Sequence, residues 1–404
     1  MRAVSNTMSS EYVVIVAAAR TPIGSFLGCL SHLEAHELGA VAIKEVLRRA
    51  AVEMDEVSEV IVGQTLTAGK GMNPGRQAAA LAGIPYEVPA YTINMLCGSG
   101  LKAIMLGAQS LRAGDANVVV CGGQESMSRA EHTMYARNPS KFGDVTIRDS
   151  LISDGLQCPL ADTHMGVTAE NVAKAWNISR NDQDFFAVHS QQKAAKAQKT
   201  EVFDAEIISV EVGSGKSVHM DEFPRPNTTT ESLSKLKPAF VTDGTGTVTA
   251  GNATGLNDGA AFCVLMQEAE ARKRGLQPLA RIVSYSQVGV NPQIMGIAPV
   301  PAVLAALSKA DWTTDSVDLF EFNEAFAAQS LAVIRDLSLK EEKVNICGGA
   351  IALGHPLGAS GARILTTLVY AMRSRGARRG VAALCVGGGM GVAMCVERPP
   401  EFDG

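Results

Sequence analysis

The chain repeats one pattern of strand, glycine-rich turn and apolar helix in its two halves, and this repeat limits the fold more than any other feature. In the first half, Gly98-Ser-Gly100 opens a helix with apolar residues at helical spacing, and an apolar strand follows from Asn117 to Cys121. In the second half, Gly358-Ala-Ser-Gly361 opens a similar helix, and a strand follows from Val381 to Val386. Each such layer needs a neighbour to cover its apolar face, so the repeat predicts a layered α/β protein.

Between the two halves, the character of the chain changes. From about Met127 to Ala250, charged residues, prolines and threonines accumulate, and apolar strands bounded by glycine stop. Ser179 and Asp182 have the spacing of a capping box, which predicts a helix running towards Gln198. We therefore expect three parts: an N-terminal half (1–126 with 251–276), an inserted loop domain (127–250) and a C-terminal half (277–404).

The composition excludes several classes of partner. The 404 residues carry 36 Lys and Arg against 41 Asp and Glu, a net charge of −5, so no basic excess recruits nucleic acid or an anionic membrane. The eight cysteines include no CxxC pair, which argues against a zinc ribbon or a disulfide framework. No apolar run approaches a membrane span, and neither end reads as a secretory, transit or peroxisomal signal. We expect a cytoplasmic protein.

Cys97 follows a short strand and immediately precedes the first glycine-rich turn. Gly98 and Gly100 permit a tight turn and the close approach of a ligand. The positive end of the following helix favours the thiolate over the thiol, so the placement suits a nucleophile. Taken alone, the position is more typical of a buried, inert cysteine, and the interpretation depends on partners elsewhere.

Three further motifs stand at strand ends or helix starts of the second half, where open α/β sheets bind their ligands. Each has a structural alternative: Asn323 as the cap of a helix beginning at Glu324, His355 as a packed loop residue, and Cys385 as inert core. The glycine-rich stretch after Cys385 is not a dinucleotide fingerprint. Only thirteen residues follow Gly391, too few for the acidic ribose partner expected about twenty residues on.

Two other local patterns have a structural interpretation. Gly122-Gly123 predicts that the strand before it leaves the sheet sharply. His32 and His36 have the spacing of a helical metal pair, but no third ligand candidate follows, so we interpret them as structural or solvated side chains.

Together, the four motifs closely resemble the thiolases over essentially the whole chain. They are NMLCGSG around Cys97, NEAFA around Asn323, GHPLGASGAR around His355 and LCVGGGMG around Cys385. Two glycine-rich stretches between the first and second motifs, 242–244 and 249–259, also match. The resemblance implies a five-layered α/β/α/β/α fold built from two duplicated halves, with coenzyme A held by the inserted loop domain.

The resemblance also implies a reaction and an assembly. Two acetyl-CoA would condense reversibly to acetoacetyl-CoA and free CoA. Coenzyme A would act as substrate and product, with no metal and no further cofactor. Members of the family are homotetramers or dimers, so we expect a homotetramer.

Each motif then has a chemical role. Cys97 takes the acetyl group of the first acetyl-CoA, which splits a difficult step into two easier ones, and a neutral His355 accepts its proton. Cys385 is the base for the methyl group of the second acetyl-CoA. By resemblance, His355 and a water held by Asn323 stabilise the enolate oxygen. The backbone N–H groups of Cys97 and Gly387 stabilise the tetrahedral intermediate.

Coenzyme A contacts also follow from the resemblance. His164 and Met165 match the pantetheine-side motif, and Thr254 stands where a small hydroxyl meets the pantetheine. Arg225 and Ser232 match positions near the adenine, although an arginine in a polar loop is also typical of a solvated surface. The remaining expected contacts are Ala250, Gly251, Ala325 and Phe326. His164 and Cys158 make no metal site, because two ligands are too few.

One departure from the family concerns the acyl group. The segment Gln157–Thr163 lacks the aromatic residue expected beside the acyl pocket, which leaves the preferred chain length open. The nearest alternative is a degradative 3-ketoacyl-CoA thiolase with a longer pocket. A ketoacyl synthase would usually carry histidine at the position of Cys385, and a silent CoA-binding homologue would need neither cysteine.

Overall fold

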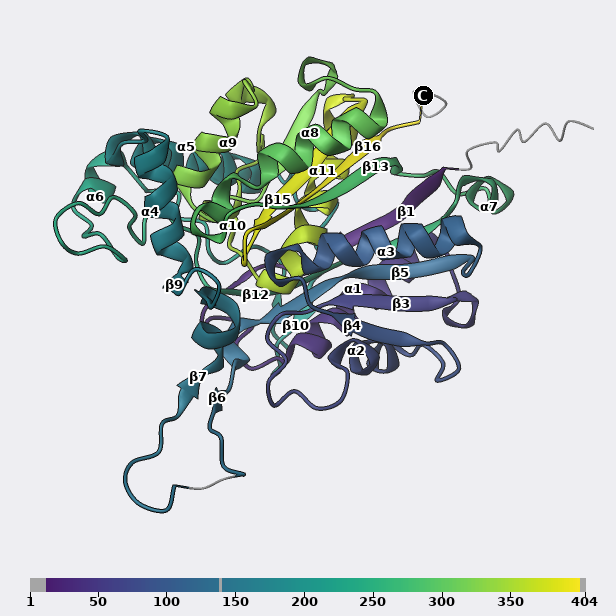
Figure 1. The fold of residues 1–404 in the computed structure, drawn as a ribbon. Coiled ribbons are helices and arrows are strands. Elements are labelled where there is room, and N and C mark those ends of the chain that lie inside the picture. The colour runs from purple at the N-terminus through teal and green to yellow at the C-terminus, as the bar shows by residue number, and fades with distance from the viewer. Residues whose placement is uncertain (1–11, 138–139, 400–404) are drawn as a thin grey trace, which may run out of the picture.

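The computed structural model describes residues 12–137 and 140–399, so the ends, where no targeting signal was expected, lie outside the described residues. A ten-stranded sheet runs through the molecule in the order β14-β15-β16-β13-β1-β12-β5-β3-β4, with β2 paired to β12 (Figure 1). Its strands are β1 (Val13–Arg20), β2 (Gly24–Ser25), β3 (Glu59–Gly63), β4 (Ala90–Ile93), β5 (Val118–Ser126), β12 (Asn257–Gln267), β13 (Ala280–Gly289), β14 (Leu319–Phe322), β15 (Arg379–Val386) and β16 (Met390–Glu397).

The two halves of the chain meet in the middle of this sheet. β1 and β13 pair there antiparallel, with Val13 opposite Ile282. Antiparallel pairs continue outward to β5 on one side and β15 on the other. Parallel pairs follow, β5 with β3 and β3 with β4 at one end and β15 with β14 at the other. Both edges therefore carry the parallel strands whose ends bear the motifs.

Helices cover the sheet in three apolar cores. α3 (Ser99–Ala113) and α11 (Ser360–Arg375) pack on each other and share one core with strands of both halves. α1 (Ala35–Ala50) and α2 (Pro74–Ala82) cover a second core, on the first half. α8 (Pro299–Ala310) and α9 (Ala327–Asp336) cover a third, on the second half. The predicted repeat thus places its two apolar helices against each other.

Short helical segments complete the connections: η1 (Met54–Glu56), η2 (Leu96–Gly98), η3 (Met127–Arg129), η4 (Leu151–Leu156), η5 (Pro292–Ile297), η6 (Thr314–Ser316), η7 (Glu341–Lys343), η8 (Leu357–Ala359), α7 (Glu268–Lys273) and α10 (Ala350–Leu353).

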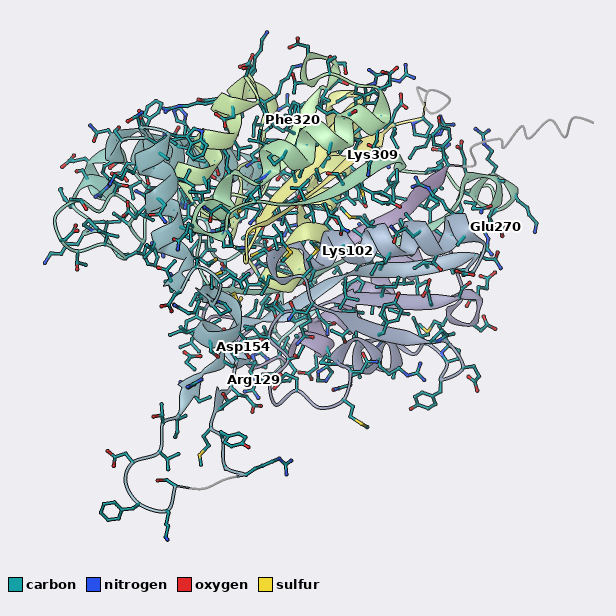
Figure 2. All side chains as sticks on the ribbon, in the orientation of Figure 1. Lys102, Arg129, Asp154, Glu270, Lys309 and Phe320 are labelled. Atoms are coloured by element: carbon teal, nitrogen blue, oxygen red, sulfur yellow. The ribbon has the colours of Figure 1, made fainter. Side chains whose placement is uncertain are left out.

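The segment from 127 to 250 contributes no strand to the large sheet among its described residues. It forms three short strand pairs and three helices: β6 (His132–Thr133) with β7 (Arg148–Asp149), β8 (Gln157–Cys158) with β9 (Thr163–His164), β10 (Val210–Glu211) with β11 (Ser217–Val218), α4 (Met165–Ala175), α5 (Arg180–Lys199) and α6 (Thr230–Ser234). The hairpin of β6 and β7 extends away from the body, and the labels of Arg129 and Asp154 mark its base (Figures 1 and 2). The capping box of Ser179 and Asp182 at the start of α5 is confirmed.

Two local expectations were wrong. Gly122-Gly123 does not end a strand, because β5 continues to Ser126 and the glycines lie where a side chain would overlap Ala261 and Gly358. The helix expected from Glu324 begins at Ala327, since the chain before it stays extended and bridges Phe326 to Ala253. His32, interpreted with His36 as structural or solvated, precedes α1, so the two residues form no helical pair.

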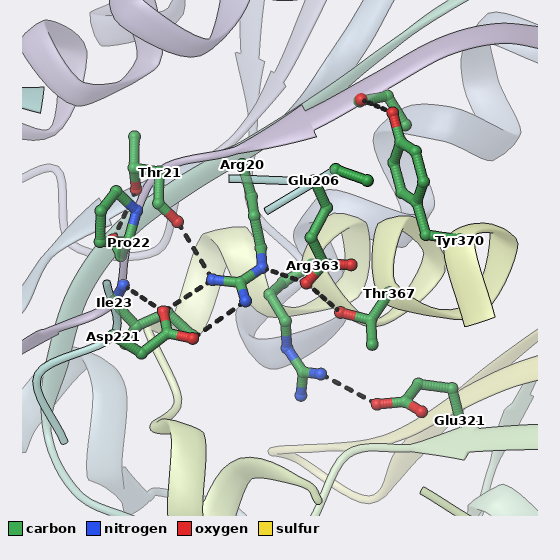
Figure 3. Close-up of polar contacts among 12 residues, drawn as sticks. Arg20, Thr21, Pro22, Ile23, Glu206, Asp221, Glu321, Arg363, Thr367 and Tyr370 are labelled. Atoms are coloured by element: carbon green, nitrogen blue, oxygen red, sulfur yellow. Dashed lines mark hydrogen bonds and ion pairs between the residues drawn. The ribbon is translucent and has the colours of Figure 1, made fainter. Parts of the chain in front are cut away.

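A fully buried arginine ties the inserted segment to the sheet (Figure 3). Arg20, at the end of β1, donates to Glu206 through Nε (2.6 Å) and to Asp221 through both terminal nitrogens (2.7 and 2.9 Å). Asp221 also accepts from the backbone N–H of Ile23 (2.8 Å), and Glu206 accepts from Thr367 on α11 (3.1 Å). Buried charges are tolerated only with such complete partners, so the loss of one partner is costly.

We therefore expect Asp221→Ala to lower the free energy of unfolding by about 3 to 5 kcal/mol, because half of the Arg20 guanidinium loses its partner in the core. Urea unfolding followed by circular dichroism measures the change. Glu231→Ala is the control, since the Glu231–Lys235 pair is exposed and contributes little. Equal stability of Asp221→Ala and Glu231→Ala would contradict the role of the network.

Candidate active site

Cys97 lies in the η2 turn between β4 and α3. The preceding residue, Leu96, has a φ of 48°, a left-handed conformation that is strained for a leucine and that tends to occur at functional sites. Asn94 Oδ1 accepts from the Leu96 N–H (2.9 Å), and Ser99 Oγ donates to the Leu96 carbonyl (2.7 Å), so side chains on both sides hold the turn. The turn presents a partly exposed Cys97 at the start of α3.

Burial governs the protonation of Cys97. Desolvation raises the pKa of the thiol to about 11, against the backbone N–H groups of Gly387 and of Cys97 itself, which lower it. The buried Glu125 raises it further. The expectation that the helix start favours the thiolate was therefore wrong for this site, because desolvation outweighs the backbone donors. Cys97 is a thiol near neutral pH and needs a base.

His355 is suited to be that base. Its ring is 4 % exposed, and burial, followed by the nearby Arg363, lowers its pKa to about 3, so the expected neutral form is confirmed. Nδ1 lies 2.5 Å from Ser360 Oγ, which donates its own proton to the Pro356 carbonyl (2.8 Å). The Ser360 oxygen can then only accept, which places the ring proton on Nδ1. Nε2 then carries the lone pair and faces Nδ2 of Asn323, which can donate to it (3.3 Å).

Asn323 follows β14, and its Nδ2 lies 3.3 Å from Nε2 of His355. The Oδ1 atom of Asn323 is buried and has no hydrogen-bond partner in the described part of the chain. Buried polar atoms are rarely left unpaired, and such an atom is free to bind a water or a ligand. The two side chains thus form one polar site inside an apolar surrounding.

Cys385, near the end of β15, is 1 % exposed. Burial raises the pKa of its thiol far above the ordinary range, and the Cys97 sulfur raises it further, which makes the two sulfurs electrostatic neighbours. Close backbone packing joins the two motifs, since a side chain at Gly98 would lie 2.9 Å from Val386. The structure therefore brings residues of the first and second halves to one place.

A cavity of about 380 Å³ adjoins these residues, next to Leu96 and Gly387. Its other lining residues are Ser153, Asp154, Gly155, Gln157, Cys158, Pro159, Leu160, Met165, Gly388 and Met390. Four of them belong to the segment Gln157–Thr163, so this segment, which lacks an aromatic residue, borders the cavity. A wider hollow of about 570 Å³ between α5 and α6 is lined by none of the expected catalytic side chains.

Several expected coenzyme A contacts gather around Cys385. Met165, Ala325 and Phe326 share its apolar cluster, which also holds Met295 and the ring of Phe240. His164 stacks on Phe240 at 4.9 Å between ring centroids, and burial lowers its pKa. Its Nδ1 accepts from the N–H of Gly166 (3.0 Å), which fixes the ring at the start of α4.

The other expected contacts lie farther out. Thr254 donates to the Ala350 carbonyl (2.8 Å), and Gly251 packs beside Leu233 of α6, the helix that carries Ser232. Ser232, Arg225 and Ala250 are exposed. The Arg225 guanidinium lies over the ring of Phe223 at 5.3 Å. These residues line no common cavity with Cys97 in the described structure.

Three site residues were missed by the sequence interpretation. Glu125 accepts hydrogen bonds from both active-site loops, Asn257 accepts the backbone N–H of His355 (2.9 Å), and Ser360 fixes the His355 ring. For Glu125, the only signal in the sequence was a carboxylate in an apolar strand next to two glycines.

Among the described residues no group of three or more His, Cys, Asp or Glu side chains is placed to hold a metal ion, and no helix is long and apolar enough to cross a membrane.

Comparison with known proteins agrees with this geometry. Residues 13–269 match the model of the thiolase N-terminal domain, and residues 276–398 match that of the C-terminal domain. The chain is 58% identical to a cytosolic acetyl-CoA acetyltransferase of Mus musculus over 96% of this chain and 99% of that one. It is 55% identical to an acetyl-CoA acetyltransferase of Rhizobium meliloti, covering 97% and 100% of the two chains.

The crystal structure of the Bacillus anthracis acetyl-CoA acetyltransferase has the same mixed α/β fold, with a TM-score of 0.93 at 45% identity over 96% of this chain and 99% of that one. Both family models together span nearly all of the described residues. The chain belongs to the thiolase family.

Proposed function

We propose that this protein is an acetyl-CoA C-acetyltransferase, which condenses two acetyl-CoA to acetoacetyl-CoA and CoA and catalyses the reverse thiolysis. The observation that carries the proposal is a pair of neighbouring cysteine sulfurs, one from each half of the chain, together with a buried, neutral His355 beside Asn323. The activity of relatives at 51% to 58% identity supports it.

The first step is acyl transfer to Cys97. The Cys97 proton passes to Nε2 of His355 as the sulfur attacks the thioester carbonyl, and the CoA sulfur leaves with the proton of the Cys385 thiol, which becomes a thiolate. The oxyanion of the tetrahedral intermediate is stabilised by the N–H groups of Gly387 and Cys97, both of which already hydrogen-bond to the sulfur. Burial favours this step because it keeps the imidazole neutral.

The second step forms the carbon–carbon bond. The Cys385 thiolate removes a proton from the methyl group of the second acetyl-CoA, and the resulting enolate carbon attacks the acetyl carbonyl on Cys97, whose sulfur leaves and takes its proton back from His355. The enolate oxygen lies by His355 and a water bound to the unpaired Oδ1 of Asn323. Losing one such donor typically costs about 10²- to 10³-fold in rate.

Coenzyme A binding belongs to the same proposal. The pantetheine passes His164, Met165 and Thr254 and the backbone of Ala250 and Gly251, beside Ala325 and Phe326, and the adenine reaches Arg225 and Ser232. The shared cluster of Met165, Ala325 and Phe326 with Cys385 supports the inner part of this path. The domain division at 126/127, 250/251 and 276/277, with five layers from duplicated halves, is supported by the three helix-covered cores.

We propose that the protein assembles as a homotetramer and that it lies in the cytoplasm. The hairpin of β6 and β7 supports association, because it exposes five large apolar side chains that have little contact with their own chain: Met134, Tyr135, Phe142, Val145 and Ile147. The mouse relative is a cytosolic enzyme, which supports a cytoplasmic location for this protein.

Two cysteine variants test the mechanism. Cys97→Ala is expected to abolish acyl-enzyme formation, because it removes the nucleophile, whereas Cys385→Ser retains the acyl-enzyme and loses condensation. Trapping with radiolabelled acetyl-CoA after acid quenching measures the first step. Equal labelling of Cys97→Ala and the wild type would end the assignment.

A chain-length series distinguishes this function from a degradative 3-ketoacyl-CoA thiolase. Thiolysis of acetoacetyl-CoA is expected to exceed that of long-chain 3-ketoacyl-CoA, because the mouse relative is an acetyl-CoA acetyltransferase. The absence of an aromatic residue among Gln157, Cys158, Pro159 and Leu160 is the observation that favours the rival. A kcat/KM that rises with chain length would establish the rival function.

The protonation of the site predicts how Cys97 responds to pH. Because burial raises its thiol pKa to about 11, iodoacetamide labelling of Cys97 in the free enzyme is expected to rise about tenfold per pH unit between pH 7 and 10. The depressed pKa of His355, about 3, adds no further step in this range. Peptide mass spectrometry measures the labelling, and a plateau reached near pH 7 would contradict the buried thiol.

A further inference from the structure

Glu125 connects the loop after β3, which lies beside the nucleophile turn, to the loop that carries His355. Glu125 lies near the end of β5, and its side chain is fully buried. Oε1 accepts from the backbone N–H of Leu66 (3.1 Å), and Oε2 accepts from those of Thr65 (2.9 Å) and Gly358 (2.8 Å). One carboxylate thus bonds to backbone from both halves of the chain.

The first of these loops leads to Cys97. The Thr65 carbonyl accepts from Asn94 Nδ2 (3.2 Å), and Asn94 Oδ1 accepts from the Leu96 N–H (2.9 Å). Leu96 is the strained residue that presents Cys97. Two side chains, Glu125 and Asn94, therefore fix the conformation of the nucleophile turn relative to the sheet.

The second loop leads to His355. Gly358 lies three residues after His355 and two before Ser360, which holds the imidazole. A side chain at Gly358 would lie 2.6 Å from Gln64 Cα and 3.0 Å from Glu125 Oε2, so the loop is pressed against the carboxylate and against the first loop. A shift of Gly358 would move both the ring and the hydroxyl that orients it.

We propose that Glu125 is a positioning residue for the reaction, which sets the separation and orientation of Cys97 and His355 by binding the loop of His355 and the loop after β3 that holds Asn94 of the nucleophile turn. This inference rests on the proposed function. Misplacing a reacting group by about 1 Å can cost about 10²-fold in rate, so a residue that touches no substrate can control kcat.

The charge of Glu125 has a second, measurable effect. Burial raises its pKa to about 7, although three backbone N–H groups favour the ionised form. The ionised carboxylate raises the pKa of Cys97. A neutral replacement of the same shape should therefore lower the Cys97 pKa, an effect that a purely structural residue would not produce.

Glu125→Gln tests both effects. The amide keeps the shape but places N–H donors against a backbone N–H, so we expect kcat for thiolysis of acetoacetyl-CoA to fall about 10- to 100-fold. KM is expected to stay within about twofold, because Glu125 contacts none of the expected coenzyme A residues. The pH profile of Cys97 alkylation is expected to shift to lower pH.

Asp258→Asn is the matched control. Asp258 is also fully buried, lies on the neighbouring strand β12, and accepts two hydrogen bonds from Ser128 (2.9 and 2.6 Å), but it bonds to neither active-site loop. It is expected to keep the wild-type kcat and alkylation profile. Asn94→Ala, at an exposed position, removes the links to Thr65 and Leu96 but keeps Glu125, and it is expected to lower kcat about tenfold with KM unchanged, even if Glu125→Gln fails to fold.

The outcomes separate this inference from the proposed function. An active wild type with Glu125→Gln or Asn94→Ala within twofold of its kcat would overturn the positioning role, and so would an equal loss in Asp258→Asn. An unshifted alkylation profile in folded Glu125→Gln would overturn the electrostatic effect. A wild type without thiolysis or acyl-enzyme would instead reject the proposed function.

Discussion

Backbone contact between the two halves of the chain is the constraint on which the site depends. The starts of α3 and α11 approach so closely that a side chain at Gly100 would lie 2.8 Å from the Ala362 nitrogen, and one at Gly361 would lie 2.8 Å from Leu101 Cβ. A side chain at Gly123 would likewise overlap the backbone carbonyl of Gly358. Glycine alone fits such distances, and this contact brings the turn of Cys97 against the loop that follows His355.

Desolvation then decides the chemistry of that pocket. It keeps His355 neutral, Cys97 and Cys385 protonated and Glu125 near its titration point, although the backbone donors at Cys97 and Glu125 act in the opposite direction. A neutral base beside a neutral thiol leaves neither group charged in the resting dry site, and charge develops only when the proton passes to the imidazole. The polar groups around the site are bonded in chains, through Ser360, Asn257, Glu125 and Asn94.

The inserted segment is fastened to this centre by interactions of two kinds. Apolar packing of Met165, at the start of α4, and of Phe240 against Cys385 and Phe326 places these parts of the segment beside the site. The ion pairs of Arg20 with Glu206 and Asp221 fix its later part to β1, and Thr367 extends the same network to α11. The segment therefore covers the pocket without adding a strand to the sheet.

The sequence by itself determined the family, the capping box at Ser179 and the two apolar helices that open at Gly98–Gly100 and Gly358–Gly361, because cap spacing, apolar periodicity and motif order are local or ordinal features. Only the tertiary structure decided that β5 continues through Gly122-Gly123, that α9 starts at Ala327, that Cys97 is a thiol, and that Glu125 joins both loops. Each of these depends on a residue far away in the chain. These interactions leave no periodic pattern in a sequence, so they can be identified only once the fold is known. They are the backbone overlap at the glycines, the bridge to Ala253, the desolvation of Cys97 and the non-local hydrogen bonds of Glu125.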